Sequence, residues 1–107
     1  MTALSEPEAR LAHALILRLR PRLTLWFHQP LGVTDASGGN VGVERRFAAL
    51  SGLPLRRLPR YPGSAPTWEN HRLLGSTAFV VELPAAAPST MQIRRYVHAV
   101  RSVAVLG

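Results

Sequence analysis

The sequence predicts a protein of the α/β class. Two short apolar runs rich in strand-forming residues alternate with segments whose apolar residues recur at helical spacing, so the predicted order is helix, strand, helix, loop, strand, helix. The 107 residues suffice for one small domain with one modest core. Because a parallel sheet of only two or three strands would leave open apolar edges, we expect this chain to form part of a larger sheet.

The N-terminal segment predicts a helix over residues 5–20. Ser5 can cap its start, and Pro7 suits the first turn of a helix. Pro21 disfavours helical geometry in the residue before it, so we expect the helix to end by Arg20. Leucines at helical spacing give this helix an apolar face: Leu11, Leu15 and Leu19.

A strand, a loop and a second helix follow. Residues 23–27 are a short apolar run of strand formers, typical of a strand that is covered on both faces. The glycine- and serine-containing stretch 31–40 predicts a loop. The second helix is expected over residues 43–51 with Phe47 facing inward, and Gly52 ends it.

The C-terminal half contains the clearest strand. Residues 53–66 hold four prolines and predict an extended, exposed loop. The apolar run 77–83 predicts a strand, and residues 89–105 predict the last helix. One side of that helix carries apolar residues: Ile93, Val97 and Val100.

Composition narrows the classes of function. The net charge is +7 and all 13 basic residues are arginine, a pattern typical of codon bias in GC-rich genomes, so the charge is weak evidence for nucleic acid as a partner. The absence of cysteine excludes disulfides, thiolate zinc sites and thiol catalysis. No apolar run is long enough for a membrane span and no signal-peptide pattern opens the chain, so we expect a cytoplasmic location by default. Nothing in the sequence indicates the oligomeric state.

Two polar side chains on the predicted strands are candidates for chemistry. His28 closes the first strand at its carboxyl end, where open α/β sheets place ligand-binding groups, so it could bind a metal or simply bond a backbone carbonyl. Glu82 lies in an apolar strand, where a carboxylate is rarely buried without a partner. It could act as a general base, or it could reach solvent or pair with an arginine.

A third candidate is Tyr61, in a loop rich in proline and glycine. A tyrosine there could contact a substrate, or it could anchor the loop by packing its ring and hydrogen-bonding its hydroxyl. The segment Trp68-Glu69-Asn70 follows this loop. Both interpretations of Tyr61 stay open on the residues alone.

Several segments taken in order resemble the zinc carboxypeptidases, and within them the murein peptide amidase branch. The resemblance covers nearly the whole chain. It depends on the order and joint spacing of four segments more than on any one motif. The segments are SEPEAR (5–10), WFHQP (26–30), YPGS (61–64) and FVVELP (79–84).

This resemblance implies a fold, a cofactor and a set of roles. Residues 1–107 would form one partial domain, the C-terminal portion of an α/β/α sandwich with a mostly parallel mixed sheet. His28 would be the third zinc ligand, Glu82 the general base and acid, and Tyr61 a substrate-binding residue. Zinc would be the cofactor, and the substrate a peptide or a peptidoglycan-derived peptide cleaved near its free C-terminus.

The chain also departs from the family pattern. None of its histidines has a glutamate three positions later, so the His-x-x-Glu zinc motif is missing, as is the family's Asn-Arg pair that binds the substrate carboxylate. One histidine cannot supply three zinc ligands. We therefore expect a truncated or remnant hydrolase that is inactive alone. The alternatives are a small basic module for nucleic acid or an anionic cell-wall polymer, and a non-catalytic remnant that binds a partner through an exposed sheet edge.

Overall fold

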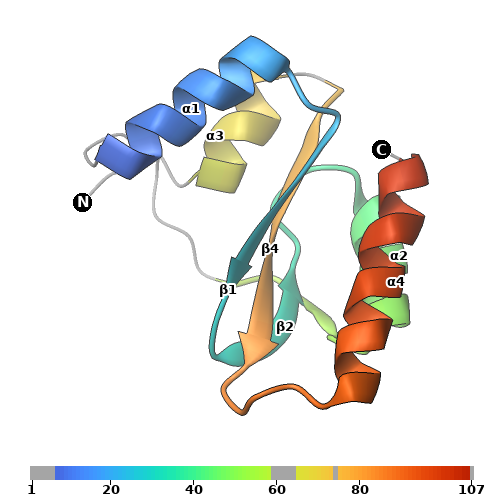
Figure 1. The fold of residues 1–107 in the computed structure, drawn as a ribbon. Helices are drawn as coiled ribbons and strands as arrows, with labels where there is room; N and C mark the ends of the chain where they lie inside the picture. Colours follow the sequence, from blue (N-terminus) through green and yellow to red (C-terminus); the bar gives the residue numbers. More distant parts are fainter. Residues whose placement is uncertain (1–6, 59–64, 74, 107) are drawn as a thin grey trace.

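The computed structural model describes residues 7–58, 65–73 and 75–106 (Figure 1). Four helices and four strands make up this part of the chain. The helices are α1 (Pro7–Leu19), α2 (Val41–Ser51), α3 (Ala65–Arg72) and α4 (Thr90–Leu106). The strands are β1 (Leu23–His28), β2 (Leu31–Asp35), β3 (Leu55–Arg56) and β4 (Thr77–Pro84).

The strands form one open mixed sheet in the order β1-β4-β2-β3. The pairs β1–β4 and β2–β3 are parallel, and β2 pairs with β4 in the antiparallel sense. Between β1 and β2 the chain therefore passes around the carboxyl end of β4, where the Gln29 side-chain amide donates to the Pro84 carbonyl at 3.2 Å. The predicted α/β class with a mostly parallel mixed sheet is confirmed.

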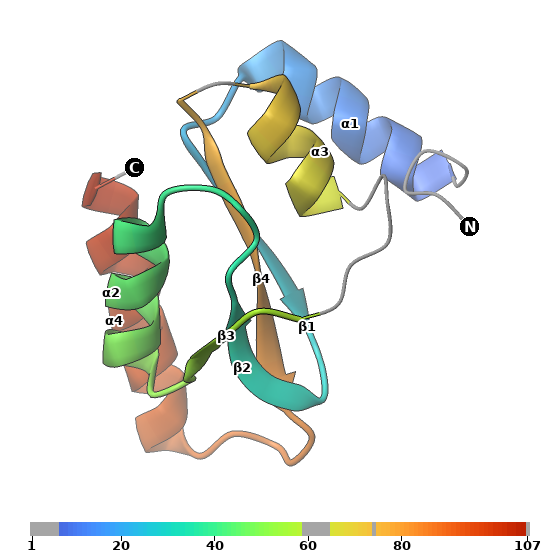
Figure 2. The ribbon, with the colours of Figure 1, turned by 180° about the vertical axis from the view of Figure 1, so that it is seen from behind.

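Helices cover both faces of the sheet. Figures 1 and 2 show α1 and α3 on one face, and α2 and α4 packed side by side on the other. The hydrophobic core fills the space between the sheet and the α2–α4 layer, where the Phe47 and Phe79 rings meet edge to face with centroids 5.6 Å apart. Phe47 faces inward as predicted, and the layers are those of an α/β/α sandwich.

The prediction of a loop over residues 31–40 is wrong for its first half. Leu31–Asp35 forms β2, which pairs with β4 on one side and with β3 on the other. Gly32 adopts a left-handed backbone, with φ of 63°, where the strand begins beside Pro84. A strand partner distant in sequence overrides the local turn-forming tendency of this stretch.

The prediction of one extended loop over residues 53–66 is also wrong in part. Leu55–Arg56 pairs with β2 as the short strand β3, and the helix α3 begins at Ala65. Pro66 lies in the first turn of α3, where the missing N–H of proline costs nothing. Composition alone places Pro66 in a loop, although a proline is equally suited to the start of a helix.

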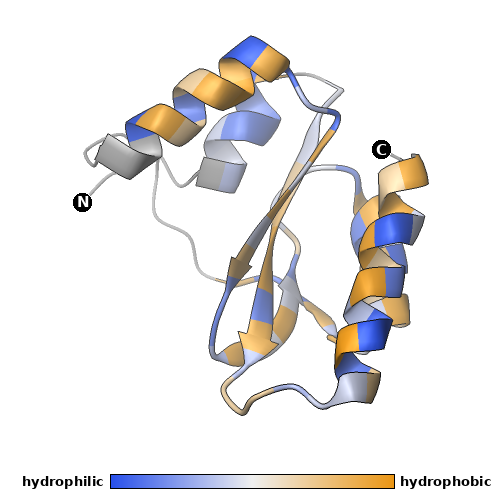
Figure 3. Cartoon of the chain, viewed as in Figure 1, coloured by the Kyte–Doolittle hydropathy of each residue, from blue (hydrophilic) through white to orange (hydrophobic). Residues whose placement is uncertain are grey.

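The helices α1 and α4 bury sides other than their predicted apolar faces. In α1, Leu11, Leu15 and Leu19 are 72%, 54% and 65% exposed, whereas His13 and Ile16 are buried. In α4 the buried residues are Tyr96, Ala99 and Val103, while Ile93 and Val97 are exposed. Figure 3 shows hydrophobic residues distributed around both helices, so spacing alone did not single out the buried side.

No helix within the described ranges is long and apolar enough to cross a membrane.

Candidate functional site

The ends of β1 and β4 bring two of the predicted site residues together. The strands are parallel and in register, so that His28 is the strand partner of Glu82. His28 Nδ1 lies 3.9 Å from Glu82 Oε2, within ion-pair distance but longer than a hydrogen bond. The His28 side chain is 59% exposed and that of Glu82 is 11% exposed. The pair therefore has one open side, toward the histidine.

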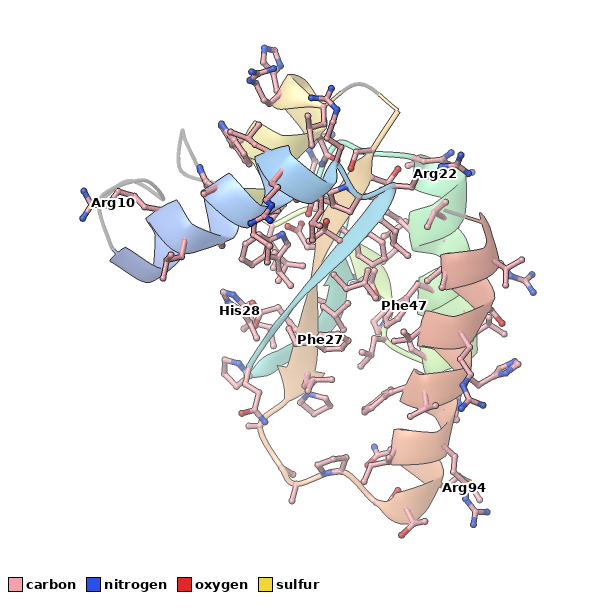
Figure 4. All side chains as sticks on the ribbon, turned by 45° about the horizontal axis from the view of Figure 1, so that its top comes forward. Arg10, Arg22, Phe27, His28, Phe47 and Arg94 are labelled. Carbon is pink, nitrogen blue, oxygen red and sulfur yellow. The ribbon has the colours of Figure 1, made fainter. Side chains whose placement is uncertain are left out.

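Alternation along the strands decides which face of the sheet carries this pair. Phe79 and Val81 are fully buried in the core against α2 and α4, so Glu82 points to the opposite face. Figure 4 agrees, because His28 and Phe47 lie on opposite sides of the sheet. On the same face as His28, Thr24 of β1 donates a hydrogen bond to Glu69 of α3. The site thus lies on the α1–α3 face of the sheet.

The position of Glu82 is fixed by its place in the middle of the sheet. β4 has β1 on one side, and on its other side Val33 of β2 is the strand partner of Glu82. The backbone around the carboxylate is therefore held by neighbours on both edges, and its oxygen is aimed at the imidazole. A buried carboxylate beside an exposed imidazole can exchange protons with a bound molecule or share a ligand with the histidine.

Tyr61, the predicted substrate-binding residue, lies outside the described residues. Its role stays a prediction.

The described residues do not form a complete catalytic zinc site. Within the described part of the chain, no group of three His, Cys, Asp or Glu side chains is close enough to hold a metal ion. His28 and Glu82 supply one nitrogen and one carboxylate, whereas catalytic zinc sites use three protein ligands and keep a further position open. Zinc binding by this chain therefore stays a prediction.

A buried polar cluster at the other end of β1 was not predicted from the sequence. The His13 ring stacks on Trp68 with centroids 3.7 Å apart and planes 11° from parallel. Neither ring nitrogen of His13 has a hydrogen-bond partner among the described residues, and burial lowers the pKa of His13. The stack joins α1 to α3, so this histidine is a packing residue.

Glu69 belongs to the same cluster and is completely buried. One carboxylate oxygen accepts hydrogen bonds from the hydroxyls of Thr24 at 2.6 Å and Ser76 at 3.1 Å. Burial raises the pKa of Glu69, and these two hydrogen bonds act in the opposite direction. The segment Trp68-Glu69-Asn70 did stand out in the sequence, but its helical position in α3 was not predicted.

Asn70 completes the attachment of α3 to the sheet. Its side-chain amide donates to the Ala78 carbonyl and accepts from the Ala78 N–H, both at 2.8 Å. The same amide donates to the Ser37 carbonyl at 2.9 Å. These contacts imitate strand pairing, and they assign a structural role to this end of the molecule.

A solved structure resembles this chain over nearly its whole length. No model of a known protein family matches the chain, and no curated protein matches it. Among solved structures, the crystal structure of murein-tripeptide amidase MpaA from Escherichia coli O157 is similar, with a TM-score of 0.62 and 26% sequence identity. The chain resembles a murein-tripeptide amidase. The predicted resemblance to the zinc carboxypeptidases, in their murein peptide amidase branch, is thereby confirmed.

The extent of the match differs between the two proteins. It covers 95% of this chain but 41% of the amidase chain. The chain therefore spans less than half the length of the amidase, and most of the amidase has no counterpart in it.

Proposed function

We propose that this chain carries the His28–Glu82 part of the site of a zinc-dependent peptide hydrolase of the murein peptide amidase kind. The observation that carries the proposal is the in-register pair, 3.9 Å apart, in a fold similar to that of a murein-tripeptide amidase. The substrate would be a peptide, including one derived from peptidoglycan, cleaved near its free C-terminus. Tyr61 would contribute to holding it.

The exposure of the two side chains fits different roles. Glu82 is held rigidly in the central strand and is nearly buried, which suits a general base that takes the proton of the attacking water and passes it to the leaving amine. His28 is more exposed, and a neutral imidazole at a strand end suits a zinc ligand. Because the described residues supply too few ligands, we expect the chain alone to bind zinc weakly and to show no turnover.

A zinc titration followed by the NMR signals of the histidine rings tests this assignment. His28 should shift at lower zinc concentrations than His71 and His98, which are also exposed. His28→Ala should remove this first binding event, and His98→Ala is the matched control that should leave it intact. If zinc perturbs the three exposed histidines alike, the assignment of His28 as a ligand is lost.

A second candidate function is a basic module that binds nucleic acid or an anionic cell-wall polymer. Every arginine whose exposure the structure describes is exposed, whereas every carboxylate whose exposure it describes is buried. Figure 4 shows Arg10, Arg22 and Arg94 in well-separated parts of the molecule, so these three do not form one patch. Tight, salt-sensitive binding of DNA in a shift assay would favour this candidate over the hydrolase.

A further inference from the structure

A small cavity lies at the end of the sheet opposite the His28–Glu82 site. It has a volume of about 220 Å³ and lies where α1 leads into β1 and α3 leads into β4. Figure 4 shows Arg22 at the start of β1 and His28 at the other end of that strand. Pockets for drug-sized ligands have volumes of roughly 300–1,000 Å³, so this cavity suits a smaller ligand. Its lining residues are Arg20, Pro21, Arg22, Leu73, Gly75 and Ser76.

Two arginines give this cavity its charge. Arg20 and Arg22 are both exposed, and neither forms an ion pair with any residue that the structure describes. Glu69 reaches this end of the molecule through its hydrogen bond from Ser76, but it is fully buried and forms no ion pair with either arginine. A guanidinium group carries only donors, and it binds oxyanions through paired N–H···O contacts. The charge of both arginines is therefore available to an anionic ligand.

The backbone of Arg20 is unusual for an arginine. Its φ is 49°, and within the described part of the chain no other residue except glycine has a positive φ. The Arg20 N–H donates to the Ile16 carbonyl at 2.7 Å, so Arg20 is the left-handed cap that ends α1. Glycine is the usual residue at such a position, because a side chain makes this backbone less favourable. An arginine that is kept despite a backbone cost is typical of functional sites.

Hydrogen bonds hold the walls of the cavity in place. The Ser76 hydroxyl donates to the Pro21 carbonyl at 2.7 Å, and the Thr77 N–H donates to the Arg22 carbonyl at 2.8 Å. The Ser76 N–H donates to the Leu73 carbonyl at 3.0 Å. These bonds join the start of β1 to the connection between α3 and β4. Because the backbone is already ordered, a ligand would have to immobilise only the arginine side chains.

We propose that Arg20 and Arg22 together bind a phosphate group in this cavity. The helices α1 and α3 both end here, and the carbonyl groups at their ends repel an anion, so the two guanidinium groups must supply the attraction. A phosphate group is favoured over a carboxylate because its three oxygens can accept from two guanidinium groups at once. The cavity and the His28–Glu82 pair are at opposite ends of β1, so this inference does not depend on the proposed hydrolase.

Titration of the full chain with inorganic phosphate, followed by amide NMR at constant ionic strength, tests the site. The signals of Gly75 and Ser76 should shift and saturate, whereas that of His28 should not move. Arg22→Gln should weaken binding by about tenfold or more, as expected when a charge-assisted hydrogen bond is lost. Arg18→Gln is the matched control. Arg18 is exposed in the last turn of α1 but does not line the cavity, so the affinity should change by less than about twofold.

Arg20→Gly provides a second test with two independent readouts. Phosphate binding should weaken by about tenfold or more, because one guanidinium group is lost. The melting temperature without phosphate should stay the same or rise, because glycine accepts the left-handed backbone at this position. If Arg20 served only to stabilise the C-terminal end of α1, its removal would lower the melting temperature and leave phosphate binding unchanged.

A parallel titration with phenyl phosphate identifies the source of the phosphate group. Tighter binding of phenyl phosphate would indicate a small phosphorylated molecule as the ligand, and tighter binding of inorganic phosphate would indicate the free ion. Both results support the site.

Four results would overturn the inference. The first is the absence of a saturable shift at Gly75 and Ser76 up to about 20 mM phosphate. The second is an equal loss of affinity in Arg18→Gln and Arg22→Gln, which would indicate a general attraction to the basic surface. The third is an unchanged phosphate affinity in Arg20→Gly. The fourth is a shift of the same signals by duplex DNA but not by phosphate, which would assign the arginines to nucleic acid.

Discussion

Glu82 and Glu69 are both buried, and their surroundings distinguish them. Glu82 lies 3.9 Å from the exposed imidazole of His28. Glu69, in α3, accepts hydrogen bonds from the hydroxyls of Thr24 and Ser76. Glu82 can therefore reach a bound molecule on the open side of His28, whereas Glu69 is enclosed by its partners. In the sequence, His28 stands out because it ends an apolar strand and Glu82 because it lies within one. The sequence could not show that they meet, since their proximity depends on strand register.

Glu82→Gln tests the chemistry at the residue scale. In any form of this protein that cleaves a murein tripeptide with zinc, the substitution should reduce cleavage by about 10²-fold or more while leaving the zinc content intact, because only the proton acceptor is lost. Release of the free amino acid is the readout, and Glu69→Gln serves as the control that keeps activity. Full activity of Glu82→Gln would falsify its assignment as the base.

The buried carboxyl of Glu69 should make the free energy of unfolding depend on pH. Its pKa is raised above the ordinary value of 4.5, so its contribution to stability is present below that value and is lost as pH rises through the folded-state pKa. Glu69→Gln removes this loss and can keep the hydrogen bonds from Thr24 and Ser76. The difference in unfolding free energy between variant and parent should therefore move in favour of the variant as pH rises above about 4.5.

The measurement is urea unfolding at a series of pH values. His13 acts in the opposite sense, because its lowered pKa makes stability fall as pH drops below its ordinary value of 6.5. Both chains retain His13, so its contribution cancels in the difference. If the difference in unfolding free energy stays constant with pH, or moves against Glu69→Gln, the raised pKa of Glu69 is contradicted.

At the scale of elements, local signals explain what could be predicted. The strands β1 and β4 and the helices α1, α2 and α4 follow from apolar runs and end signals, whereas β2 and β3 exist because strands distant in sequence pair with them. The buried side of α1 was missed for a related reason. Its stripe of leucines is the more apolar side, and only the tertiary structure shows that His13 and Ile16 pack instead.

The start of α4 offers an element-scale prediction. Ser89 Oγ accepts from the Gln92 N–H at 3.1 Å, and Gln92 Oε1 accepts from the Ser89 N–H at 2.8 Å, which is a reciprocal capping box. Ser89→Ala should lower the free energy of unfolding by about 1 kcal/mol. Thr90→Ala, one position along, is the control and should stay within about 0.5 kcal/mol of the parent in the same urea titration.

At the scale of the whole molecule, the two faces of the sheet differ in how much apolar side-chain surface is buried against them. The α2–α4 face holds the core, and the opposite face carries the candidate site and borders the exposed leucines. Burial also varies within the α2–α4 face, toward which Phe27 points by strand alternation. Phe47 is fully buried, while Phe27 is 47% exposed at the end of the edge strand.

Truncating these two rings should have unequal effects on stability. Phe47→Ala should cost about 3–5 kcal/mol or prevent folding, because it opens a cavity in the core. Phe27→Ala should cost less than half as much in the isolated chain, since water already reaches that ring. Thermal unfolding followed by circular dichroism compares them, and equal losses would contradict the difference in burial between the centre of the core and the end of β1.

The central position of β4 has a consequence for the order of folding during synthesis. β1 and β2 are both made early, yet each has β4 as a neighbour, and β4 is the last strand to be translated. Until β4 leaves the ribosome, the two earlier strands have apolar edges and no partner between them, so the nascent chain is exposed to aggregation during that interval. We expect a chaperone that binds extended apolar segments to associate with ribosome-bound chains that stop before Thr77, and to dissociate once β4 has emerged.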